Sequence, residues 1–134
     1  MTASMSPELY WTILTAGMTS IQWAPHIAQR IIEMKPYAAF RDPRHDVPTK
    51  AAWAQRAIRA HTNTTENLVV FAILALAIQA TGVGTTLTAG ASVLFFAARA
   101  AHYTVYVLGI PWMRTPIFLV GFGCQAILFV TLVG

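Results

Sequence analysis

Three polar side chains that could hold a ligand recur at helical spacing inside a strongly apolar segment. Arg59, Asn63 and Glu66 are spaced i, i+4 and i+7, so a helix places them on one face. His61 and Asn67 flank this face. A guanidinium, an amide and a carboxylate together offer hydrogen-bond donors, acceptors and charges of both signs. This face is therefore suited to binding a polar ligand or to pairing with another polar face.

A second polar face follows in a later apolar segment, where Arg99, His102 and Tyr106 are spaced i, i+3 and i+7. Ionisable groups at membrane depth are costly and usually face the interior of a helical bundle or a water-filled cavity. We therefore expect the two faces to point at one another or at a common ligand.

An ion pair between the two faces is geometrically possible. Glu66 lies ten positions after Arg56, and Arg99 lies ten positions before Gly109, where its helix is expected to end on the same side. Both residues are then on the order of 15 Å from that end of the bundle. The sequence predicts a Glu66–Arg99 pair, within one chain or between copies, which either serves a site or only fixes the helix register.

The composition of the chain is that of an integral membrane protein. It has 134 residues, of which 56% are hydrophobic and 10% charged, whereas soluble domains average about 25% charged. A single domain of this size could not bury so much apolar surface in water. The one cysteine, Cys124, excludes an internal disulfide and a cysteine-based metal site, and it fits the interior as a small apolar residue. We find no metal site, Walker motif, dinucleotide fingerprint or nucleophile elbow.

Four apolar segments predict an all-α, four-helix transmembrane bundle that forms one domain, 1–134. The segments cover residues 7–32, 51–81, 85–108 and 115–133. Each is near the ~20 residues that a helix needs to cross the hydrocarbon layer. The polar stretch 34–50 contains three prolines and is predicted to be an irregular loop.

The basic residues indicate how the bundle is oriented. All nine lie at or near one end: Arg30, Lys35, Arg41, Arg44, Lys50, Arg56, Arg59, Arg99 and Arg114. The positive-inside rule places this end in the cytoplasm and both termini on the other side. We expect anionic membrane lipids, and no nucleic acid, to be the partner of this charge. No cleavable signal peptide is recognised, and the alanine-rich composition favours a bacterial inner membrane, with the endoplasmic reticulum left open.

The segment 56–67 resembles the signature of the MAPEG family, the membrane-associated proteins in eicosanoid and glutathione metabolism. The family pattern Arg-Ala-x-x-Asn-x-x-Glu is matched by Arg59, Ala60, Asn63 and Glu66. The later segment is similar to the microsomal glutathione transferases through Arg99, His102, Tyr106, Pro111 and Arg114. The resemblance extends over nearly the whole chain, including its length, its four predicted helices and its long first loop.

This resemblance implies a homotrimer whose active sites lie between subunits at the cytoplasmic side. Several members bind glutathione there as co-substrate and join its sulfur to an apolar electrophile that arrives through the lipid, and some reduce lipid hydroperoxides. By position, Arg114 would stabilise the reacting thiolate beside Tyr106, and these two residues are the implied catalytic pair. The implied glutathione-binding residues are Arg30, Arg59, His61, Asn63, Glu66, Arg99 and His102.

The sequence departs from the family pattern at two points. In the leukotriene-synthase branch of the family a tyrosine often stands where His102 falls here, and the spacing from Tyr106 to Arg114 varies among members. Two functional classes follow, a glutathione transferase or peroxidase and a non-catalytic, lipid-binding or accessory membrane protein of the same fold. Retention of Arg114 and Tyr106 favours the enzyme. A small transporter is disfavoured, because no inverted repeat or broken midplane helix is evident.

Overall fold

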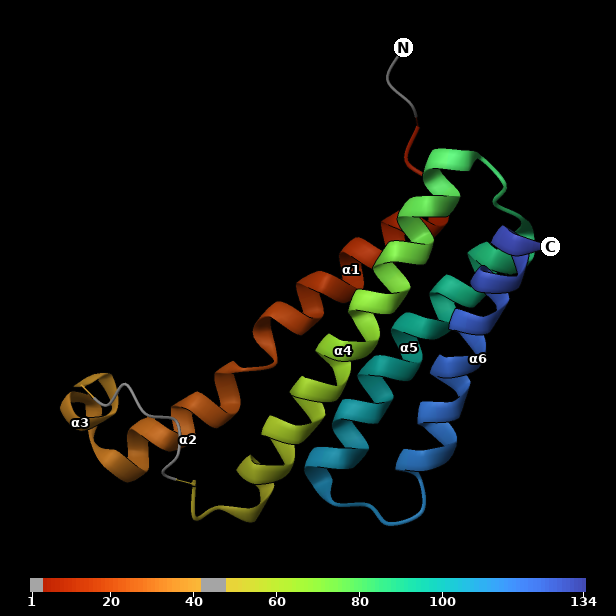
Figure 1. The fold of residues 1–134 in the computed structure, drawn as a ribbon. Coiled ribbons are helices and arrows are strands. Elements are labelled where there is room, and N and C mark those ends of the chain that lie inside the picture. The colour runs from red at the N-terminus through yellow and green to blue at the C-terminus, as the bar shows by residue number, and fades with distance from the viewer. Residues whose placement is uncertain (1–3, 42–47) are drawn as a thin grey trace.

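The computed structural model describes residues 4–41 and 48–134, and its regular structure in these ranges is entirely helical (Figure 1). The helices are α1 (Pro7–Ile21), α2 (Ala24–Met34), α3 (Pro36–Arg41), α4 (Ala52–Thr81), α5 (Thr86–Leu108) and α6 (Arg114–Val133). Helix α1 packs against α4 and α5, and α4, α5 and α6 pack against one another. Helices α2 and α3 extend sideways from this group.

Three of the described helices, α4, α5 and α6, are long and apolar enough to cross a membrane. Their bounds differ from the predicted segments 51–81, 85–108 and 115–133 by no more than one residue at either end. The all-α class and the membrane-spanning helices are therefore confirmed, while the bundle of four spans stays a prediction.

The first predicted span, 7–32, forms two helices rather than one. Helix α1 ends at Ile21 and α2 begins at Ala24. Pro25 has no N–H to donate, and its ring would clash with the carbonyl of Ile21 in a continuous helix. The chain tightens instead, with the Gln22 N–H donating to the Thr19 carbonyl at 3.2 Å. A hydrophobic run alone did not reveal this break.

The stretch 34–50 is also more regular than predicted, because residues 36–41 form the helical turn α3. Lys35 adopts a positive φ of 65°, which ends α2, and Pro36 then begins a helix in a new direction. Residues 42–47 of this predicted loop, including Arg44, lie outside the described residues.

Helix α1 has an inverted polarity that suits a lipid environment. Its buried residues are Glu8, Thr12, Thr15 and Thr19, and its exposed large residues are Tyr10, Ile13, Leu14 and Ile21. The threonine hydroxyls donate to carbonyls one turn earlier, from Thr12 to Glu8 at 2.7 Å and from Thr19 to Thr15 at 2.8 Å. The polar face is thus satisfied internally, and the apolar face is left for the hydrocarbon.

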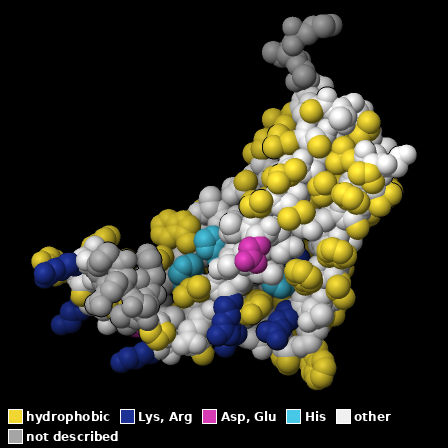
Figure 2. Space-filling model, in the orientation of Figure 1, with side chains coloured by type: hydrophobic (Ala, Val, Ile, Leu, Met, Phe, Trp, Pro, Cys, Tyr) yellow, Lys and Arg dark blue, Asp and Glu magenta, His cyan; other side chains and the backbone are white. Residues whose placement is uncertain are grey.

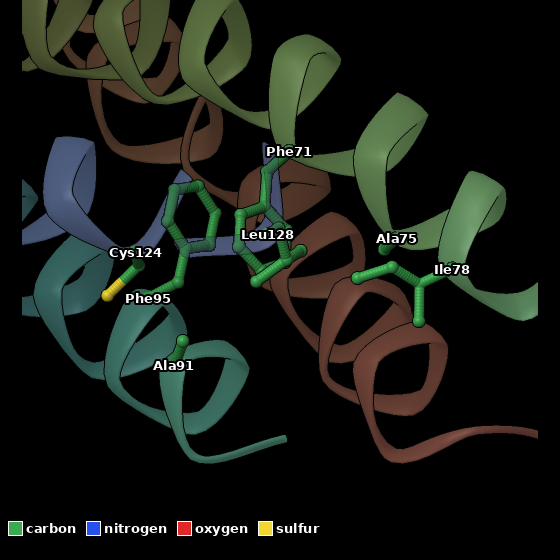
Figure 3. Packing of buried hydrophobic residues seen from close by; sticks show 7 residues of the cluster. All are labelled: Phe71, Ala75, Ile78, Ala91, Phe95, Cys124 and Leu128. Atoms are coloured by element: carbon green, nitrogen blue, oxygen red, sulfur yellow. The ribbon is translucent and has the colours of Figure 1, made fainter. Parts of the chain in front are cut away.

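The apolar core lies between α4, α5 and α6 (Figure 3). The rings of Phe71 on α4 and Phe95 on α5 stack with centroids 3.9 Å apart and planes 7° apart. Leu128 and Cys124 of α6 complete the cluster, so Cys124 is a buried, free thiol with an apolar surrounding. This packing sets how α4 and α5 are rotated toward each other.

A buried carboxylate joins the first turns of α1 and α5. Glu8 is fully enclosed and accepts a hydrogen bond from the Thr88 hydroxyl. It also lies against Gly84, where an added Cβ would be 3.1 Å from its Oε1. The carboxylate belongs to the first turn of α1 and contacts Thr88 in the first turn of α5, and the dipoles of both helices favour negative charge there. A cavity of about 670 Å³ opens beside it.

A second carboxylate holds the end of α2 against the start of α4. Glu33 Oε1 accepts hydrogen bonds from the Thr49 hydroxyl at 2.8 Å and the Ala51 N–H at 3.2 Å, and Oε2 accepts from the Lys50 N–H at 3.2 Å. The side chain of Gln29 donates to Oε1 at 3.0 Å. These bonds, those from Gln29 and Thr49 above all, lower the pKa of Glu33 to about 2.

The Glu33 contacts predict a pH-dependent contribution to stability. Because the pKa in the folded protein is about 2 and the ordinary value is 4.5, the contribution is fully present above about pH 4.5 and is lost as the pH falls toward 2. We expect Glu33→Gln to lower the thermal unfolding midpoint in detergent at neutral pH. The difference from wild type should shrink below pH 4. A difference that stays constant from pH 7 to pH 3 would contradict this assignment.

Candidate functional site

A cavity of about 390 Å³ lies at the basic end of the spans, between α4, α5 and the turn that joins α5 to α6. Its polar lining is cationic and aromatic, and consists of Arg56, Arg59, Tyr106, Trp112 and Arg114. Figure 2 shows the Lys and Arg side chains gathered at this end of the visible face. Three guanidinium groups around one cavity make it suited to an anionic ligand.

The turn between α5 and α6 brings Arg114 back over α5. Helix α5 ends at Leu108 and is capped by Gly109, whose φ of 70° few other residues adopt, and Trp112 also has a positive φ of 68°. After this reversal, α6 begins at Arg114. The guanidinium carbon of Arg114 lies 5.4 Å from the centroid of the Tyr106 ring. The two implied catalytic residues are therefore in direct cation–π contact.

Arg56 is a residue of this cavity that the sequence reasoning missed. Its Nε donates to the Val107 carbonyl at 3.0 Å, and its guanidinium carbon would lie 3.0 Å from a Cβ added at Gly109. Arg56 thus holds the end of α5 while it lines the cavity beside Arg59. The signal was present in the sequence, because Arg56 and Arg59 are spaced i, i+3 and share a helical face.

Arg99 lies deeper, where α4, α5 and α6 meet, and its side chain is fully buried. Its Nη1 donates to Asn63 Oδ1 at 3.2 Å, which joins the two predicted polar faces. The guanidinium carbon lies 5.6 Å from the ring centroids of both Phe95 and Phe118. Nε and Nη2 have no hydrogen-bond partner within the described part of the chain.

His102 is buried between this deep arginine and the cavity. Its ring centroid lies 5.6 Å from that of Tyr106 and 6.3 Å from that of Phe118. Arg99, His102 and Tyr106 therefore follow one another along the inner face of α5, from the buried interior to the cavity.

The predicted ion pair between Glu66 and Arg99 within one chain is wrong. Glu66 is exposed on the outer face of α4, whereas Arg99 is fully enclosed and bonds to Asn63. Each residue turns a helix by ~100°, so Glu66 lies about 60° around α4 from Asn63. A pair formed between copies stays a prediction.

Two further implied ligand residues, His61 and Arg30, are not among the described residues that line the cavity. The ring of His61 faces α2, with its centroid 5.9 Å from that of His26. Arg30 is half-buried on α2, which packs against α4. The structure thus brings Arg59, Tyr106 and Arg114 together, joins Asn63 to Arg99 beneath them, and leaves Glu66, His61 and Arg30 elsewhere.

Comparison with known proteins identifies the class to which this fold and site belong. The model of the MAPEG family matches residues 9–134, which is nearly the whole chain. The chain belongs to the MAPEG family, and it is an integral membrane protein of that family of glutathione and eicosanoid metabolism. Neither the curated proteins nor the solved structures give a significant match.

Because Arg99 is enclosed, alanine substitutions at two glycines of α6 should affect the unfolding midpoint very differently. A Cβ at Gly121 would overlap Arg99 Nη2 and lie 3.0 Å from its Cζ. Overpacking of this kind costs ~1–3 kcal/mol, so Gly121→Ala should lower the thermal unfolding midpoint in detergent. Gly123→Ala is the matched control, because its Cβ meets nothing within 4 Å and alanine favours a helix by ~1 kcal/mol over glycine. Equal midpoints for the two variants would contradict the packing described for Arg99.

Proposed function

We propose that this protein is a membrane-bound glutathione transferase that also reduces lipid hydroperoxides, with glutathione as its co-substrate. The observation that carries the proposal is the convergence of Arg56, Arg59 and Arg114 with Tyr106 on one cavity of about 390 Å³. Membership of the MAPEG family supports it.

The cavity offers cationic groups for the anionic parts of glutathione. The tripeptide carries two carboxylates, an amine and a thiol, and is anionic overall. Arg56 and Arg59 present planar guanidiniums that can each bind a carboxylate through two hydrogen bonds. The N-terminus of α6 adds positive potential beside Arg114. This end of a helix disfavours a cation and favours a bound anion.

Arg114 is the proposed partner of the reacting sulfur. A thiolate is the nucleophile, and a free thiol is mostly protonated at neutral pH. A guanidinium remains charged in proteins, so it favours the thiolate electrostatically and takes no part in proton transfer. Tyr106 orients Arg114 through their ring contact and can donate its hydroxyl hydrogen to the same sulfur.

Two reactions follow from a bound thiolate. In conjugation, the sulfur lone pair forms a bond to an electrophilic carbon, and either a leaving group departs with its electron pair or the adduct takes a proton from water. In peroxide reduction, the sulfur attacks the O–O bond, and the leaving alkoxide is protonated to an alcohol. A second glutathione then displaces hydroxide from the oxidised sulfur and yields the disulfide.

The proposed assembly is a homotrimer in a bacterial inner membrane, with the cavity facing the cytoplasm and both termini on the other side. Glu66 supports the assembly, because it is exposed on a membrane-spanning helix where a carboxylate facing lipid would be costly. A neighbouring copy that covers this face of α4 would remove the cost. Apolar electrophiles and lipid hydroperoxides would reach the cavity from the surrounding lipid.

The activity of two variants tests this function. Arg114→Ala should reduce glutathione conjugation to an apolar electrophile by about 10²-fold or more, because it removes the main stabilisation of the thiolate. Lys50→Ala is the control, since Lys50 is an exposed cation at the same end that does not line the cavity. Both variants should unfold at the wild-type temperature.

Wild-type conjugation by Arg114→Ala would show that the assigned role is wrong. Absence of any conjugation or peroxide reduction by the intact wild-type protein, together with co-purified lipid, would favour the non-catalytic lipid-binding alternative instead.

A further inference from the structure

The short helix α3 exposes an unusual combination of side chains. Tyr37 is 77% exposed and Phe40 is 82% exposed, although both are large aromatic residues. Lys35 and Arg41 are exposed immediately before α3 and at its last residue. Within α2 and α3, Glu33 is the one acidic side chain, and its oxygens are occupied by the start of α4. The exposed charge of this segment is therefore positive.

The level of α3 relative to the membrane is fixed by its neighbours. Helix α4 has 30 residues, or ~45 Å of helix, whereas the hydrocarbon layer is ~30 Å thick, so the polar first turns of α4 extend into the head-group region. Glu33 ties the end of α2 to the residues that begin α4. Because α3 follows α2 after one residue, it lies at this same level.

The direction of α3 carries it away from the spans. The positive φ of Lys35 and the new helix start at Pro36 turn the chain sideways, and α3 packs against α2. Figure 1 shows α3 beside the bundle, near the height of the end where α4 begins. Tyr37 and Phe40 are spaced i, i+3 and so project from one side of the helix.

We propose that α3 is a docking surface for anionic phospholipid, lying in the head-group layer of the leaflet at the basic end. Tyrosine favours the boundary between head groups and acyl chains, and phenylalanine favours the acyl side of that boundary, which matches the exposure of Tyr37 and Phe40. Basic side chains are attracted to anionic lipid phosphates, which matches Lys35 and Arg41. This inference is independent of the catalytic proposal, because α3 does not line the cavity among the described residues.

A spin label at position 40 tests the docking. Phe40→Cys in a Cys124→Ala background gives one labelling site, because Cys124 is the only cysteine of the chain. The labelled protein is placed in nanodiscs of phosphatidylcholine with or without phosphatidylglycerol, and the accessibility of the nitroxide to oxygen and to a water-soluble nickel chelate is measured. Lys50→Cys in the same background is the control, at an exposed residue that lies near the level of α3 but outside it.

We expect the label at position 40 to be accessible to oxygen and several-fold less accessible to nickel than the label at position 50, most clearly with phosphatidylglycerol present. Adding Lys35→Gln and Arg41→Gln should raise its nickel accessibility in those discs. Equal nickel accessibility at positions 40 and 50 in both lipids would overturn the proposal. So would protection from both reagents, which would indicate a protein partner, or protection that depends on neither phosphatidylglycerol nor the two cations.

Discussion

The buried guanidinium of Arg99 is the contact on which the arrangement of the three spans depends. It lies where α4, α5 and α6 meet, bonds to Asn63 and fills the space beside Gly121. One hydrogen bond to Asn63 and the rings of Phe95 and Phe118 hold this charge away from water, and sliding any of the three helices would separate it from them, so the contact favours one register. That register places Tyr106 and the arginines of the cavity at one level at the basic end.

The cost of placing a charge within the hydrocarbon layer also explains where the cavity lies. Apolar side chains cover the outward faces of the spans, whereas most guanidiniums stay near the end where water begins. Under the proposed function, an anionic thiol would enter this cationic cavity from the aqueous side and apolar molecules would enter it from the lipid side. Arg56 strengthens the arrangement, because it both lines the cavity and holds the last turn of α5.

The sequence was sufficient for the spans and for the inner face of α5, since hydrophobic length and helical periodicity depend on one helix at a time. The sequence was not sufficient where the outcome depends on how two helices pack together. Asn63 and Glu66 both lie on the predicted polar face of α4, and the Phe71–Phe95 stack sets the rotation at which Asn63 meets Arg99. The break before Pro25 was readable from proline chemistry, but the apolar run concealed it.

Thiolate stabilisation by the cationic cavity is tested most directly by a glutathione titration of the purified protein in detergent, followed by the ultraviolet absorbance of the thiolate. We expect a saturable rise in thiolate absorbance near neutral pH, because the guanidiniums around the cavity stabilise the anion. An analogue with a hydroxyl in place of the thiol should compete for the site without producing the signal. An intact protein that yields no saturable thiolate signal would show that the cavity does not stabilise a glutathione thiolate.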